Sequence, residues 1–177
     1  NRDCKFKPKK THWYKKRDFK NLKTNLSSKS ETNVILELGS KQWKKKIHKV
    51  KNLKVHFIDN SSQLMIGDGI TILKIDDNYL PFLNQTEILE KFASVTVDMG
   101  AVKFMCNGAN VMRPGIKRYT EFGANDVICV IEESQHKFLA VGRAMTDSSA
   151  LEGMSKGEVI KNLHYISDKY WEISKTV

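Results

Sequence analysis

The sequence lacks several features that would assign it to a common class of protein. No apolar run approaches the roughly 18 residues of a membrane-spanning helix, and the basic first 20 residues contain no apolar segment of a secretory signal. Its three cysteines, Cys4, Cys106 and Cys129, lie far apart, which fits neither a zinc site nor a disulfide scaffold. We therefore expect a soluble, cytoplasmic protein without a metal or a cofactor.

Catalytic signatures are missing as well. The chain has no G-x-S-x-G elbow, no phosphate-binding loop, no H-E-x-x-H and no C-x-x-C. The five histidines show no metal-ligand spacing. Asp76, Asp77 and Asp98 fit a turn and a helix cap better than catalytic carboxylates. The sequence thus predicts a protein that is not an enzyme and has no catalytic residues.

What the sequence does have is an uneven positive charge. The chain of 177 residues is 40% hydrophobic, enough for a folded core, and carries a net charge of +10. Residues 1–54 contain 18 basic and four acidic residues, whereas residues 93–177 contain ten of each. A stretch this positive favours a polyanion such as RNA as its partner. For residues 1–20 the alternative is a flexible, solvated basic tail.

The first half reads as a small α+β domain over residues 21–94. Helical spacing is present over 19–26, and Ser28 with Glu31 resembles a capping box for a helix that Gly39 would end. The spacing of Trp43, Ile47 and Val50 predicts a second, lysine-rich helix. Three extended stretches follow, at 53–58, 63–66 and 70–75, the last two joined by a Gly-Asp-Gly hairpin turn. They predict a three-stranded sheet.

The second half reads as a small β-barrel over residues 95–174. Asp98 is a suitable N-cap for a short helix that Asn107 and Gly108 would end. After it, extended segments separated by turn residues dominate. We expect these segments at Asn110–Met112, Val127–Ile131, Phe138–Ala144, Val159–Ile166 and Tyr170–Ile173.

Parts of this second half resemble a known RNA-binding domain. The run from Gly100 to Ile116, GAVKFMCNGANVMRPGI, is similar to the opening helix and first turn of a PUA domain. The segments 141–145, 156–157 and 162–171 resemble its closing strands. With an α+β domain ahead of it, the chain looks most like the malignant T-cell-amplified sequence family of translation factors. The fold class implied is α+β, a pre-PUA domain followed by a PUA pseudo-β-barrel.

The candidate RNA-binding residues surround this helix and turn. Lys103 and Asn107 are four apart and share a helical face, and glycines allow close approach of the backbone to RNA. In PUA domains RNA lies across the helix, the glycine turn and the last strands, which adds a closing side. For each residue a purely structural or solvated role is the alternative, and His164, Tyr165 and Trp171 fit a barrel core better than a stacking surface. The candidates are Lys103, Asn107, Gly108, Arg113, Gly115, Lys117, Arg118, Arg143, Lys156 and Lys161.

The resemblance also implies partners. A member of this family would contact tRNA, at its acceptor end, and the small ribosomal subunit, in initiation, reinitiation or recycling. In eukaryotic members the N-terminal domain also pairs with density-regulated protein. Two alternatives remain open: an accessory that delivers tRNA or rRNA to a separate modifying or processing enzyme, and a protein-interaction module without RNA affinity.

Overall fold

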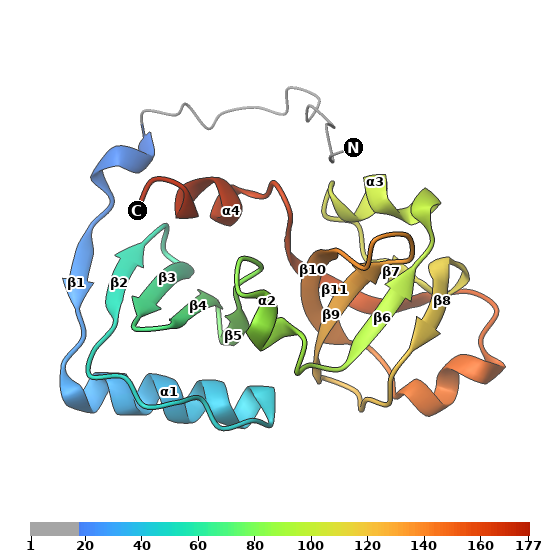
Figure 1. Ribbon diagram of the computed structural model, residues 1–177, viewed down its shortest axis with the longest axis horizontal. Coiled ribbons are helices and arrows are strands. Elements are labelled where there is room, and N and C mark those ends of the chain that lie inside the picture. Colours follow the sequence, from blue (N-terminus) through green and yellow to red (C-terminus); the bar gives the residue numbers. More distant parts are fainter. Residues whose placement is uncertain (1–17) are drawn as a thin grey trace.

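Two β-sheets, one from each half of the chain, organise the computed structural model, which describes residues 18–177 (Figure 1). The expected basic tail, residues 1–20, lies almost entirely outside the described residues. No helix within residues 18–177 combines the length and apolarity needed to cross a bilayer.

The first sheet is an antiparallel meander of five strands in chain order. A short 3-10 helix, Asp18–Asn21, precedes it, and in Figure 1 helix α1 lies below the sheet and helix α4 above it. The strands are β1 (Thr24–Leu26), β2 (Lys54–Phe57), β3 (Ser62–Gly67), β4 (Ile70–Ile75) and β5 (Asn78–Pro81).

This sheet confirms three predicted strands and adds two. The β3–β4 hairpin turns at Asp68 and Gly69 as expected, with Gly69 at a φ of +68°. The added strand β1 lies in a segment with helical spacing, because pairing with β2 outweighs that weak local preference. Strand β5 ends at Pro81 on the sheet's edge, where a residue without an N–H is tolerated. The predicted three-stranded sheet is therefore corrected to five strands, while the α+β class holds.

Helix α1, Lys29–Trp43, begins with the predicted capping box. The Ser28 hydroxyl accepts from the Glu31 N–H at 3.2 Å, and the Ser28 N–H donates to the Glu31 carboxylate at 2.7 Å. The helix continues past Gly39 to Trp43. The second helix predicted from the sequence is absent, because the chain contains no helix between Trp43 and β2. Gly39 is buried within α1, where an added Cβ would lie 2.8 Å from Ile47 Cδ1. The glycine thus makes room for the loop after α1, which returns along the helix.

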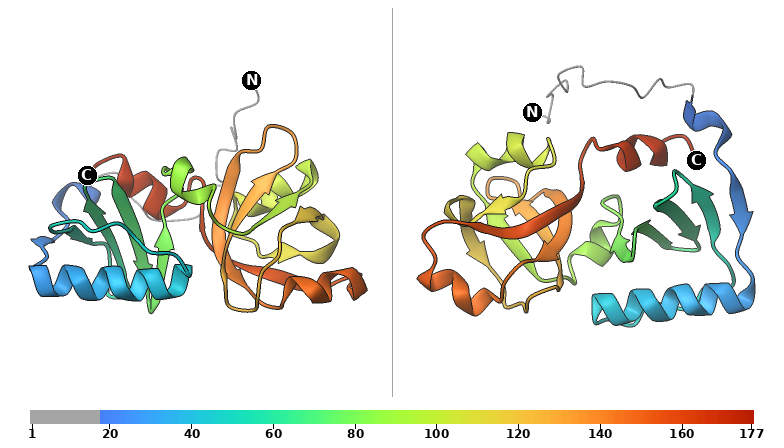
Figure 2. Two further views of the ribbon diagram at one scale, coloured as in Figure 1. Left: turned by 60° about the horizontal axis from the view of Figure 1, so that its bottom comes forward. Right: turned by 180° about the vertical axis from the view of Figure 1, so that it is seen from behind.

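The second sheet curls into a nearly closed barrel, as expected (Figures 1 and 2). Its strand order is β7-β11-β10-β9-β6-β8, and only β6 and β9 are parallel neighbours within it. Short helices join the strands: α2 (Thr86–Leu89), η2 (Met99–Ala101), α3 (Val102–Met105), η3 (Arg113–Gly115) and η4 (Ser148–Gly153). The strands are β6 (Ser94–Val97), β7 (Val111–Met112), β8 (Ile116–Tyr119), β9 (Val127–Glu132), β10 (Phe138–Ala144) and β11 (Glu158–Tyr165).

The chain ends in a helix, although an extended segment is predicted at Tyr170–Ile173. Helix α4, Lys169–Ser174, is capped by Asp168, whose side chain accepts from the Trp171 N–H at 2.7 Å. Tyr170 belongs to the apolar core of the first sheet, and the Trp171 ring stacks at 6.2 Å from the Phe82 ring. The end of the second half therefore packs on the first. The domain boundaries at 20/21 and 94/95 stay a prediction.

Candidate nucleic-acid interface

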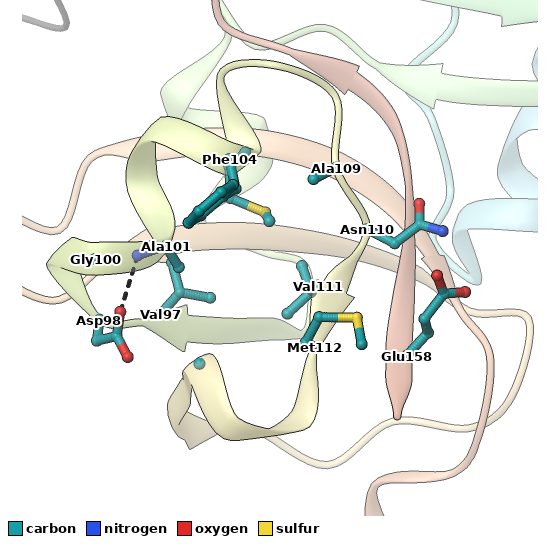
Figure 3. Close-up of a pocket in the computed structure, with 12 residues that line it drawn as sticks. Val97, Asp98, Gly100, Ala101, Phe104, Ala109, Asn110, Val111, Met112 and Glu158 are labelled. Carbon is teal, nitrogen blue, oxygen red and sulfur yellow. Dashed lines mark hydrogen bonds between the residues drawn. The ribbon is translucent and has the colours of Figure 1, made fainter. Parts of the chain in front are cut away.

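An apolar groove of about 600 Å³ lies on the barrel beside α3, at one end of β6 and β7 (Figure 3). In that view Phe104 on α3 faces Met112 and Glu158 across the groove. The groove is lined by Val97, Asp98, Gly100, Ala101, Phe104, Met105, Ala109, Asn110, Val111, Met112, Gly115 and Glu158.

Asp98 fixes the helical wall of this groove. Its carboxylate accepts from the Ala101 N–H at 2.9 Å and begins η2, as predicted from the sequence. Its backbone N–H donates to the Gly115 carbonyl at 2.9 Å, which ties the start of the helical wall to η3 on the opposite side. A single residue thus positions both edges of the groove.

The turn after α3 is held against strand β11. Gly108 has a φ of +85°, and an added Cβ would lie 2.9 Å from the Tyr165 ring, so glycine is required on both counts. The Asn162 side-chain amide donates to the carbonyls of Met105 and Ala109 at 3.2 and 3.0 Å, and its backbone N–H donates to the Asn110 side chain at 3.0 Å. These contacts fix the backbone that carries the groove.

Large apolar side chains stand exposed at the groove or next to it. Phe104 and Met112, which line it, are 53% and 46% exposed, and Met99, which lies between two lining residues in the chain, is 49% exposed. Clustered exposure of this kind marks a binding surface, since single scattered apolar residues are the norm elsewhere. The Lys103 ammonium lies 4.9 Å from the centre of the Phe104 ring, which places a cation directly beside the aromatic face. An aromatic ring next to a cation suits a nucleotide, with its flat base and charged phosphate.

One predicted residue lines this groove, and three more lie on the helix and turn beside it. Gly115 lines it, and Lys103, Asn107 and Gly108 belong to α3 and its turn. Lys103 and Asn107 are both exposed, while Gly108 is half-buried against Tyr165. The predicted residues at or beside the groove are thus those that lie close together in the sequence, between α3 and η3.

Three further predicted cations are exposed on segments next to the groove. Lys117 and Arg118 belong to β8, which directly follows η3. Lys156 lies in the turn before β11, and the carbonyl of the next residue, Gly157, accepts from the Arg113 N–H at 2.8 Å. All three side chains are exposed, but Lys117 and Arg118 are consecutive on a strand and point to opposite faces of the sheet.

Arg113 is used inside the protein. Its Nε donates to the Leu151 carbonyl at 2.7 Å and its Nη1 to the Ile116 carbonyl at 3.3 Å, while the guanidinium lies 5.9 Å from the Tyr119 ring centre. The side chain joins η4 to η3 and β8. Its geometry therefore supports the structural alternative for this residue.

Arg143 joins the two halves of the molecule. Its Nε donates to the Asn78 side chain and its Nη2 to the Gln42 side chain, both at 2.5 Å, and its Nη1 donates to the Asn125 carbonyl at 2.7 Å. Lys161 is opposite Arg143 in the β10–β11 register and is exposed. Neither residue lines the groove, and the Arg143 guanidinium is engaged at the junction between the two halves.

The three aromatic residues weighed from the sequence, His164, Tyr165 and Trp171, are all packed in or against the apolar cores. His164 is fully buried and stacks on Phe82 at 4.5 Å between ring centres, and Trp171 packs on the first core, as the core alternative expects. Sequence reasoning missed Phe104, Met99 and Met112. The signal was present in the short helix, where Met105 is the buried position and Phe104 next to it must point elsewhere.

No group of three or more His, Cys, Asp or Glu side chains within residues 18–177 is arranged to hold a metal ion. The groove offers an aromatic face, thioethers, backbone groups and the carboxylates of Asp98 and Glu158.

Comparison with known proteins places this groove in a familiar domain. The PUA domain family matches residues 93–166, which include every residue of the groove. An uncharacterized protein of Methanocaldococcus jannaschii is 35% identical over 127 residues, covering 71% of this chain and 78% of the relative.

Two eukaryotic relatives carry informative names. Malignant T-cell-amplified sequence 1-A of Xenopus laevis is 28% identical and covers 86% of this chain and 89% of its own length. Translation machinery-associated protein 20 of Saccharomyces cerevisiae is 26% identical and covers 73% and 83%.

A solved structure shares the whole architecture. The crystal structure of a hypothetical protein of Pyrococcus horikoshii superposes with a TM-score of 0.73 at 25% identity. It covers 85% of this chain and 99% of its own. The similarity extends over both sheets, since no single half of the chain could account for such coverage.

Proposed function

Because the chain belongs to the PUA-domain proteins of the malignant T-cell-amplified sequence family, we propose that it is an RNA-binding factor of the translation machinery. The observation that carries this proposal is the exposed Phe104 ring, with Lys103 beside it, at the edge of an apolar groove. The name of the yeast relative, a translation machinery-associated protein, supports the process.

At the groove, one unpaired base stacks on Phe104 and is flanked by Met99 and Met112. Lys103 meets the adjoining phosphate, and Lys117, Arg118 and Lys156 contact the strand on either side. The base must be unpaired, because only a splayed base exposes its face to a protein ring. In this proposal the site binds and positions the RNA and catalyses no reaction.

The finer assignment is part of the same proposal. The RNA at the groove is the single-stranded acceptor end of a tRNA, and the ribosomal partner is the small subunit in the cytoplasm, during initiation, reinitiation or recycling. A partner similar to density-regulated protein would bind the N-terminal half. Co-sedimentation separates this role from that of an accessory to an RNA-modifying enzyme: a translation factor travels with small subunits in a low-salt gradient, whereas an accessory binds free tRNA and stays at the top.

The direct test is replacement of Phe104. Stacking is worth about 1–3 kcal/mol per base, so Phe104→Ala should weaken binding of a tRNA with a free 3′ end roughly 5- to 160-fold. Fluorescence anisotropy at constant salt measures the dissociation constant. Phe104→Tyr keeps an aromatic face and should bind close to the wild type.

Leu26→Ala is the matched control, because Leu26 is also an exposed apolar side chain but lies on β1 in the other half. Its affinity for tRNA should not change. Wild-type affinity in Phe104→Ala, or an equal loss in Leu26→Ala, would show that the groove is not the RNA site.

A further inference from the structure

A charged surface lies away from the groove, on the segment that leads from the last turn of α1 into β2. This segment, residues 41–54 and called the basic loop below, contains seven lysines, and no acidic residue occurs between Glu37 and Asp59. After Trp43 the chain contains no helix or strand until β2, and in Figure 1 it runs back alongside α1.

The basic loop is held in place at several points. Ile47 and Leu53 are buried in the first core. The Ile47 N–H donates to the Ser40 hydroxyl at 3.0 Å, and Leu53 exchanges two hydrogen bonds with Ser27, at 2.8 and 2.9 Å. His48 Nε2 lies 2.9 Å from the Asp68 carbonyl, which joins the loop to the β3–β4 turn. The loop is therefore an ordered surface.

Most of its lysines are left without an acidic partner. Lys44 forms an ion pair of 2.6 Å with Asp126, and Lys45 lies over the Phe92 ring. Within residues 18–177, no carboxylate comes within 4.0 Å of the ammonium groups of Lys46, Lys49, Lys51 or Lys54, all of which are exposed. Like charges held this close on a fixed backbone repel one another, and an external polyanion relieves that repulsion.

We propose that the basic loop binds the phosphate backbone of RNA without regard to sequence, as a second contact that acts together with the groove. This inference rests on the proposed function, since both surfaces serve one RNA ligand. Lysine ammonium groups are point charges suited to single phosphates. The only aromatic ring among the exposed side chains of the loop is that of His48, whose Nε2 is bound to the Asp68 carbonyl, so we expect the contribution of the loop to be positional.

The composition of the loop argues against a membrane surface. Interfacial segments bury an apolar face among lipid chains, but Trp43, Ile47 and Leu53 already face the protein core, and Val50 is half-buried. Charge alone remains on the outside. A charged surface on a fixed backbone matches a regular array of phosphates.

Salt dependence provides the test. Each phosphate contact contributes about 0.7 for single-stranded RNA to about 0.9 for a duplex to the slope of log K against log salt. Lys46→Gln with Lys49→Gln should therefore flatten that slope by about 1.4–1.8 for a structured tRNA, and should weaken binding most at low salt. Titrations between about 50 and 200 mM KCl measure the slope. Lys46→Arg with Lys49→Arg keeps the charge and should keep the slope.

The control pair is Lys137→Gln with Lys175→Gln, which removes the same charge from exposed positions elsewhere. An unchanged slope in the loop variant, or a change matched by the control, overturns the inference.

Phe104→Ala separates the two proposals, because it should lower affinity at every salt concentration without altering the slope. If Phe104→Ala leaves the affinity unchanged while the loop variant still flattens the slope, the groove proposal is wrong and the loop proposal is supported. Loop-dependent binding to phosphatidylserine vesicles without any to tRNA would refute the loop proposal.

Discussion

At the scale of single residues, Glu132 shows how one carboxylate can organise a turn. It ends β9, is 4% exposed, and accepts from the N–H groups of Ser134, Gln135 and Lys137 at 2.7, 2.7 and 3.0 Å. Burial alone would raise the pKa of Glu132, but these three N–H donors together hold its pKa below the usual value. The neighbouring Glu133 accepts from the Met99 N–H at 3.3 Å, so the turn also supports the rim of the groove.

This arrangement predicts a pH-dependent stability. A pKa that is depressed in the folded state contributes stability above the ordinary value, 4.5, and loses it as pH falls through the folded pKa. Glu132→Gln should therefore lower the free energy of unfolding by about 1–3 kcal/mol at pH 7 and by less at pH 3. Urea unfolding at both values measures the difference. Exposed Glu121→Gln is the control, and a Glu132→Gln effect that is equal at both pH values would contradict the account.

Local residue roles could be predicted from the sequence, whereas long-range ones could not. Asp98 caps its helix and Gly108 follows it as expected, because both roles depend on neighbours within about four residues. Arg113 and Arg143 have partners far along the chain, Leu151 and Gln42 among them. A positive charge beside a glycine turn gives no indication of such partners.

At the scale of elements, the start of α1 is predicted from the sequence and its end is not. The capping box of α1 is a local signal and is confirmed. Local rules predict that the helix ends at Gly39, but it continues to Trp43, and Gly39 instead makes room for Ile47 from the returning loop. Residues Trp43, Ile47 and Val50 have helical spacing because all three face the first core, two of them from a loop.

Helix α4 depends on the buried Asp168. Its carboxylate accepts from the N–H groups of Trp171 and Tyr165 at 2.7 and 2.9 Å and pairs with His164 Nδ1 at 2.7 Å. The Leu83 N–H donates to His164 Nε2 at 3.3 Å. Because a backbone N–H can only donate, Nδ1 carries the proton given to Asp168. One side chain thus joins β11 and α4, and through His164 it reaches the segment after β5.

We expect Asp168→Ala to be among the most destabilising single changes. It removes a helix cap and leaves three donors without an acceptor, that of His164 buried and the other two partly buried, which should cost about 3 kcal/mol of unfolding free energy. Urea unfolding measures the loss. Asp168→Asn keeps an oxygen for the cap and should cost less. A loss below about 1 kcal/mol for Asp168→Ala would show that α4 is not anchored in this way.

At the scale of the whole molecule, the two halves share a core. Along β9, Val127 and Cys129 face the first cluster while Ile128 and Val130 face the barrel interior, as the alternation of a strand requires. Arg143 and the Lys44–Asp126 ion pair add polar contacts at the same junction. The alternation is visible in the sequence, but a strand that is apolar on both faces does not reveal what covers its outer face.

This junction gives the molecule a fixed spatial relation between the groove and the basic loop. The net charge is concentrated before residue 55, while the PUA half is formally neutral. In our proposals, the stacking of an unpaired base belongs to the PUA half, and the excess of positive charge that attracts the phosphate backbone belongs to the other half.

The central claim, that the groove beside α3 binds single-stranded RNA, is tested most directly by nuclear magnetic resonance of the 15N-labelled protein. A trinucleotide RNA is titrated at about 200 mM salt, which screens charge contacts beyond roughly 8 Å. We predict that the largest amide shifts occur at Gly100, Ala101, Phe104 and Met112, around the groove. Shifts confined to the first sheet, or no shifts at these amides at saturating RNA, would contradict the account.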